Sequence, residues 1–145
     1  MNAPTLRLDI VSAEKQIFSG DVIMVYATGE MGELGIAPGH SQLLTTLRPG
    51  HVRVLLPNQE EEVFYISGGM LEVQPYIVSV LADTVMRADD IDEAAAMSAK
   101  EQAEKALAGK MSKIDIAKAT VELAEAAAQI RTLQQFKKRV KMKSG

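Results

Sequence analysis

Hydrophobic and polar residues alternate along the first part of the chain with the period of a β-strand. Leu6, Leu8 and Ile10 are separated by single polar residues, and residues 51–54 repeat the pattern. Turn signals recur between these runs, at Ser19-Gly20, Thr28-Gly29, Pro38-Gly39, Pro49-Gly50, Pro57-Asn58, Gly68-Gly69 and Gln74-Pro75. Short strands with turns at this spacing predict an antiparallel β-sandwich over residues 1–86.

The period changes to that of a helix after a predicted linker at residues 87–90. Asp90 is the expected N-cap, with Glu93 three residues later, and Gly109 ends the first helix. The second helix carries an apolar seam formed by Ile116, Ala119, Leu123, Ala126, Ile130 and Leu133. A short connection makes the two helices antiparallel neighbours over residues 91–138. The predicted fold class is α+β with two domains, an N-terminal antiparallel β-sandwich followed by a C-terminal antiparallel α-helical hairpin.

Alanine supplies much of the surface through which this hairpin could make contacts. A buried methyl group contributes about 0.8 kcal/mol, against about 1.5–3 kcal/mol for leucine or isoleucine, whereas alanine strongly favours the helix itself. One interpretation is a stable hairpin that docks weakly and can leave the sandwich. The other is that alanine merely permits close packing of the helices.

Positive charge is concentrated at the end of an acidic chain. The net charge is −3, yet residues 137–145 hold five basic residues and no acidic one. We predict a basic tail at residues 139–145, suited to an acidic partner, an anionic lipid surface or a nucleic acid. A solvated terminus is the alternative. Nucleic acid is disfavoured because stacking needs several aromatic residues beside the charge, and Phe136 alone lies near it.

Sequence signals for catalysis are nearly absent. The chain has no glycine-rich phosphate loop, and it has no cysteine for a thiolate nucleophile or zinc ligand. Its two histidines, His40 and His51, lack the spacing of a metal site. We therefore predict no catalytic residue, no metal and no activity of the chain by itself. No apolar stretch approaches the ~20 residues of a membrane span.

Two glycine-containing phrases identify a family. GELGIAPGH occupies residues 32–40 and SGGMLEV occupies residues 67–73, after the opening LDIVSAEKQIFSG and before the alanine-rich helices. In this order the phrases resemble the epsilon subunit of the bacterial rotary proton-translocating ATP synthase, from Leu8 to about Lys138. The competing hypothesis is a free-standing sandwich adaptor whose hairpin binds an unrelated protein.

The resemblance implies a non-catalytic subunit of the central stalk. Such a subunit couples rotation of the proton-driven c-ring to ATP synthesis and inhibits ATP hydrolysis through its C-terminal helices. The implied partners are the gamma subunit, the c-subunit ring and the alpha/beta catalytic head, with membrane contact only through the complex. The implied location is peripheral, on the cytoplasmic face of the bacterial inner membrane. Glu33 and His40 match ring-facing positions, although His40 could instead be a turn residue that satisfies local backbone groups.

The resemblance also suggests roles for residues of the helices. Arg131, Lys137, Lys138 and Arg139 match the basic residues that face the catalytic beta subunit in the inhibitory state. Ile91 and Asp92 match the start of a nucleotide-binding phrase found in some members, but Ala95 stands where that phrase has arginine. A bidentate cation for phosphate is therefore missing, and we expect no cofactor and weak or no ATP binding.

Overall fold

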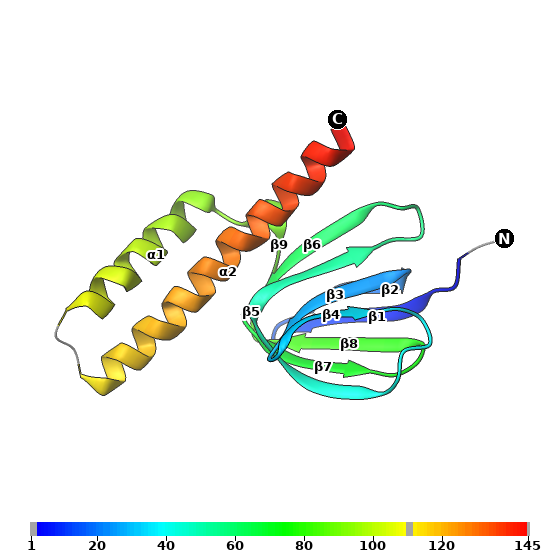
Figure 1. Cartoon of the computed structure of the whole chain (residues 1–145), viewed down its shortest axis with the longest axis horizontal. Helices are drawn as coiled ribbons and strands as arrows, with labels where there is room; N and C mark the ends of the chain where they lie inside the picture. The colour runs from blue at the N-terminus through cyan, green and yellow to red at the C-terminus, as the bar shows by residue number, and fades with distance from the viewer. Residues whose placement is uncertain (1–2, 110–111, 145) are drawn as a thin grey trace.

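A computed structural model describes residues 3–109 and 112–144, with the side chains of the last helix described as far as Val140. The strands of the described part are β1 (Leu6–Ser12), β2 (Gln16–Val22), β3 (Met24–Gly29), β4 (Gly32–Ile36), β5 (Leu43–Leu55), β6 (Glu61–Ile66), β7 (Gly69–Val73), β8 (Ile77–Ala82) and β9 (Val85–Arg87). A short 3-10 turn (Ala88–Asp90), helix α1 (Glu93–Ala108) and helix α2 (Lys113–Ser144) follow. The predicted sandwich followed by a helical hairpin is confirmed (Figure 1).

Strand β5 belongs to both layers of the sandwich. Its first half, from Leu43 to Leu47, pairs with β7, while its second half, from Gly50 to Leu55, pairs with β6. Figure 1 shows the strand bending between the layers. The prediction of a turn at Pro49-Gly50 is therefore wrong, because these two residues form a bend within one long strand. A Cβ at Gly50 would lie 2.7 Å from Thr28 Oγ1, so glycine lets β3 approach at this bend.

Two further details of the sheet differ from the sequence pattern. Ser19-Gly20 lies inside β2 and is not a turn. Strands β1 and β8 run parallel, although the other pairs in the described part are antiparallel. A parallel pair normally needs a long crossover connection. Here the chain from β2 to β7 provides that connection, so no helix is required.

Two separate hydrophobic clusters hold the molecule together. The larger lies between the layers and consists entirely of sandwich residues, with Leu8, Ile10, Val52 and Phe64 fully buried. The smaller joins the sandwich to the helices and consists of Tyr65, Ile91, Ala128 and Leu133, with Met86 packed against it. The core of the sandwich is thus complete without the hairpin.

The entry to the hairpin differs from the prediction in two respects. Arg87 ends β9 by pairing with Phe64, so the predicted linker at 87–90 begins within the sheet. Asp92 caps α1 in place of Asp90, because its Oδ1 accepts a hydrogen bond from the backbone N–H of Ala95 at 3.1 Å. Ile91 is extended and buried, which moves the start of the helix past it.

Helix α2 is a single element that continues beyond the predicted end of the hairpin. It runs through to Ser144, so residues 139–144 extend the helix and are not a separate tail. The segment contains no glycine or proline that would end a helix. Along the predicted seam Ala119, Ala126 and Leu133 are buried, whereas Ile116 remains 43% exposed.

Candidate functional site

The candidate site is the sandwich face on which α2 lies, here called the docking face. Alternation along β5 and β6 turns five side chains outward, away from the core: His51, Arg53, Glu61, Val63 and Tyr65. Helix α2 contacts both strands. Figure 1 shows α2 between the sandwich and α1, and α1 packs chiefly on α2. The hairpin is therefore folded down onto the sandwich.

The apolar half of this contact is small and closely packed. Ala128 is 0% exposed and Tyr65 is 1% exposed, and both belong to the smaller cluster with Leu133. Burial raises the pKa of Tyr65 to about 12, Glu125 adds to the rise, and a side-chain hydrogen bond with Gln129 opposes it. Docking therefore requires the neutral phenol. It loses stability as pH rises from the ordinary pKa of 10 towards 12.

The ionic half of the contact joins α2 to the strands through one shared carboxylate. Glu61 Oε2 lies 3.0 Å from Arg139 Nε, and Glu61 Oε1 lies 3.2 Å from Arg53 Nη1. The Arg53 guanidinium also stacks 3.9 Å above the Tyr26 ring. The Glu61 and Arg139 side chains are only 21% and 27% exposed. Each pair is accordingly less screened by solvent than an ordinary surface pair.

Two of the four basic residues singled out in the sequence are thus engaged within the chain. Arg139 pairs with Glu61 on the sandwich, and Lys137 Nζ lies 2.8 Å from Glu93 Oε2 on α1. Arg131 and Lys138 are exposed on α2. The cations stand out in the sequence as a basic run, whereas Glu61 does not. Its position in the alternating pattern of β6 was the available signal.

His51 is the second residue of the docking face that the sequence analysis did not identify. It is half-buried on β5, and its Nδ1 has no hydrogen-bond partner among the described atoms. Burial lowers the pKa of His51, and the nearby Arg53, Arg131 and Arg139 lower it further, while Glu33 opposes them. The imidazole is therefore held neutral between several cations.

Glu33 and His40, the residues expected to face a ring, lie towards opposite ends of β4. Glu33 is exposed beside the β3–β4 turn, opposite Thr28. His40 follows the other end of β4, and its Nδ1 lies 2.7 Å from the carbonyl oxygen of Ser41. The neighbouring Gly39 N–H donates to Pro75 O, which places this loop beside the β7–β8 turn. The structure therefore does not bring Glu33 and His40 together.

Of the phrase Ile91-Asp92, Asp92 lines a groove of about 400 Å³ between the two helices. Ile91 is part of the smaller cluster and Asp92 caps α1, so both have structural roles. Three carboxylates line the groove, those of Asp92, Glu122 and Glu125, and no lining residue is a cation. The electrostatics of this groove disfavour a polyphosphate.

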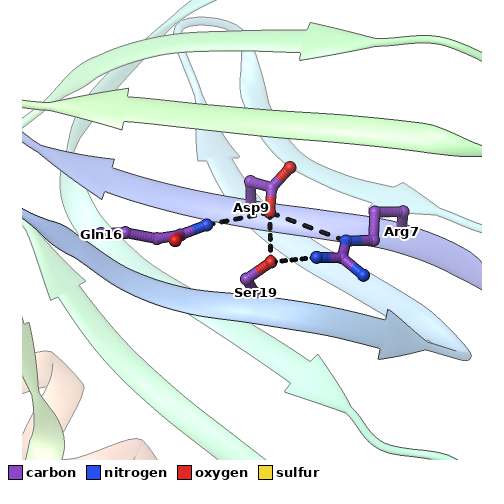
Figure 2. A network of polar contacts seen from close by, with 4 residues as sticks. All are labelled: Arg7, Asp9, Gln16 and Ser19. Carbon is purple, nitrogen blue, oxygen red and sulfur yellow. Dashed lines mark hydrogen bonds and ion pairs between the residues drawn. The ribbon is translucent and has the colours of Figure 1, made fainter.

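A second polar cluster lies on the outer surface of β1 and β2 (Figure 2). Asp9 Oδ1 accepts hydrogen bonds from Ser19 Oγ at 2.6 Å and from Gln16 Nε2 at 3.2 Å. Arg7 donates to Ser19 Oγ and lies 3.8 Å from Asp9. These contacts tie the edge strand β2 to β1, which explains why β2 continues through Ser19-Gly20.

Two other kinds of feature, a metal centre and a membrane-spanning helix, are absent from the described residues. No group of three or more His, Asp or Glu side chains in residues 3–109 and 112–144 is placed to hold a metal ion. Neither helix, over the part described, is apolar enough over a sufficient length to cross a bilayer.

Comparison with known proteins defines the class to which this fold belongs. Residues 5–88 match the model of the ATP synthase delta/epsilon chain β-sandwich domain, and residues 89–134 match that of its long α-helix domain. A chain in the cryo-EM structure of the Euglena gracilis mitochondrial ATP synthase has the same fold, with a TM-score of 0.82 at 20% identity over 92% of this chain and 84% of that one. A chain in the cryo-EM structure of the Tetrahymena thermophila mitochondrial ATP synthase central stalk and c-ring has a TM-score of 0.65 at 12% identity. The match covers 92% of this chain and 99% of that one.

Curated relatives identify the family more narrowly. The ATP synthase epsilon chain of Nitrosococcus oceani is 55% identical, covering 95% of this chain and 99% of the relative. The ATP synthase epsilon chain of Legionella pneumophila is 56% identical, covering 94% of this chain and 98% of the relative. The chain belongs to the ATP synthase epsilon family, and it is a non-catalytic subunit of that complex. The hypothesis of a free-standing adaptor is thereby rejected.

Proposed function

We propose that the chain joins the central stalk of a rotary ATP synthase, couples c-ring rotation to ATP synthesis and restrains ATP hydrolysis through α1 and α2. Its partners are the gamma subunit, the c-ring and the alpha/beta head, and its location is peripheral, on the cytoplasmic face of the bacterial inner membrane. The neighbours in solved structures support this assembly, since one of them belongs to a mitochondrial central stalk and c-ring.

The observation that carries the regulatory part is the separation of the two clusters. The sandwich core contains no helix residue, so α2 can leave without opening it. The contact that would be lost consists of Tyr65, Ile91, Ala128 and Leu133, together with the pair between Arg139 and Glu61. The Ala128 methyl group contributes about 0.8 kcal/mol and a buried leucine or isoleucine about 1.5–3 kcal/mol. With so few side chains, the contact is small beside the core of the sandwich, and its release can be reversible.

The basic residues of α2 have partners in the folded-down state that they could exchange. Arg139 and Lys137 pair within the chain with Glu61 and Glu93, while Arg131 and Lys138 are exposed. When α2 leaves the sandwich, Arg139 is released from Glu61 and joins the exposed Arg131 and Lys138 in reach of an acidic surface of the beta subunit, while Lys137 needs only to exchange its exposed pair with Glu93. Glu33 and His40 remain our candidates for contact with the ring, each from its own end of β4.

Assembly gives the direct test of this function. An affinity-tagged chain, expressed with the other synthase subunits of its own organism, should retain the gamma subunit and the c-ring through purification. Because the core is self-contained, a chain ending at Asp90 should retain them equally well. Recovery of neither chain with gamma would contradict the proposed place in the stalk.

Replacing Ala95 with arginine should create ATP affinity that the unaltered chain lacks. Ala95 lines the groove beside three carboxylates, and arginine would supply the missing bidentate phosphate donor. Arg87 does not line this groove and pairs with Glu62 at 3.3 Å. Calorimetry of the isolated chain measures the effect. Ala94→Arg is the matched control, since Ala94 is exposed and does not line the groove. Tight binding by the unaltered chain would overturn this expectation.

A further inference from the structure

His51 lies where α2 meets the sandwich, among charged or titratable side chains of β4, β5, β6 and α2. These are Glu33 on β4, Arg53 on β5, Tyr65 opposite His51 on β6, and Arg131 and Arg139 on α2. Tyr65 is neutral, and Glu61 is already shared between Arg53 and Arg139. Three arginines therefore act on the neutral imidazole, and Glu33 is the carboxylate that opposes them.

Protonation of His51 would add a fourth positive charge to this partly buried interface. Two of the three existing cations, Arg131 and Arg139, belong to the helix that has to stay docked. The Nδ1 atom has no described acceptor that would stabilise an imidazolium. Like charges in a partly desolvated contact repel more strongly than on an open surface. If α2 left the sandwich, its two arginines would move away from His51, and the imidazole would be exposed to water.

We propose that His51 is a proton-sensitive release for α2, so that acidification undocks the helical hairpin from the sandwich. The inference rests on the proposed function only in that α2 is able to leave. Whether the chain joins the stalk does not affect it.

The direction follows from proton linkage. In the docked state the pKa of His51 lies below its ordinary value of 6.5, and loss of the burial and of the two α2 arginines raises the pKa towards that value in the undocked state. The undocked state therefore binds more protons in the window between the two values. Docking is at full strength above about pH 6.5 and weakens as pH falls through the window, by at most about tenfold per pH unit for one proton.

The test follows the undocked-to-docked ratio in the isolated full-length chain. The protein has no cysteine, so Glu14→Cys on the sandwich and Gln134→Cys on α2, both at exposed positions, give two unique labelling sites for energy transfer. A Leu133→Ala background weakens the smaller cluster and brings the undocked state into the measurable range. Circular dichroism confirms that helices and sandwich stay folded between pH 8 and pH 5.5.

The histidine variants provide the comparison. Chains with His51 should undock progressively below about pH 6.5, His51→Gln should show no change over the range, and His51→Lys should be undocked already at pH 7.5. His40→Gln is the matched control, because it removes the other histidine and should follow the parent. Nuclear magnetic resonance of the unmodified chain should show His51 titrating below 6.5. The proposal is overturned if His51→Gln keeps the parent's pH dependence, if no chain shows one, or if His51 titrates at or above 6.5.

Discussion

Alanine in place of Gly69 should destabilise the sandwich by at least about 3 kcal/mol, at the upper end of the range for overpacked sites. Gly69 opens β7 and is paired on both sides, with Ala82 of β8 and Leu47 of β5. A Cβ at this position would overlap the carbonyl oxygen of Leu81, which is backbone within β8 and cannot rotate away. The two strands would have to separate, opening the larger cluster at its edge. Urea unfolding of the full-length chain measures the loss.

Gly20→Ala is the matched control for this substitution. The nearest atoms to a Cβ at Gly20 belong to the flexible Phe18 ring at 3.7 Å, an ordinary contact distance. We expect its effect to stay within about 0.5 kcal/mol. Equal stability of the two variants would show that β7 and β8 do not approach as closely as described.

Aspartate in place of Ala128 should release α2 while leaving the sandwich folded. Ala128 is fully buried against Tyr65, and burying an unpaired carboxylate costs several kcal/mol. The chain can avoid that cost by undocking the helix, since Ala128 is not part of the larger cluster. Energy transfer between labels at positions 14 and 134 should fall nearly to the undocked value. The thermal midpoint of the sandwich should change little.

Ala124→Asp separates the effect of burial from that of helix propensity. Ala124 lies about one turn earlier on α2 and is exposed, so the same residue is introduced without being buried. This variant should remain docked. Release by both substitutions would mean that aspartate destabilises the helix itself, and release by neither would contradict the description of the contact.

The sequence predicted the architecture because its hydrophobic residues recur with the strand period in the first part of the chain and with the helix period in the second. One side of each element is buried, and this produces the alternation over residues 6–10 and 51–54 and the apolar seam of α2. Turn signals were less reliable. Pro49-Gly50 has the composition of a turn but forms a bend, because the pairing of β5 with β6 and β7 overrides the local preference. The parallel pairing of β1 with β8 is a tertiary contact with no local signal.

The site was only partly predictable, for a similar reason. Arg139 and Lys137 stand out as members of a basic run, whereas Glu61 and Glu93 look like ordinary surface acids. Their pairing depends on where α2 lies across the strands. The same holds for His51, which acquires its environment only when the helix covers it. Asp92 was noted for a nucleotide phrase, yet its observed role as N-cap depends on Ile91 being buried before it.

The central claim is that this chain restrains the synthase through helices that its sandwich does not need. The most direct measurement is ATP hydrolysis by the complex reconstituted with the full chain or with the chain ending at Asp90. Both complexes should contain equal amounts of gamma subunit and c-ring, and both should support synthesis. The account predicts faster hydrolysis with the shortened chain. Equal hydrolysis rates in equally assembled complexes would contradict it.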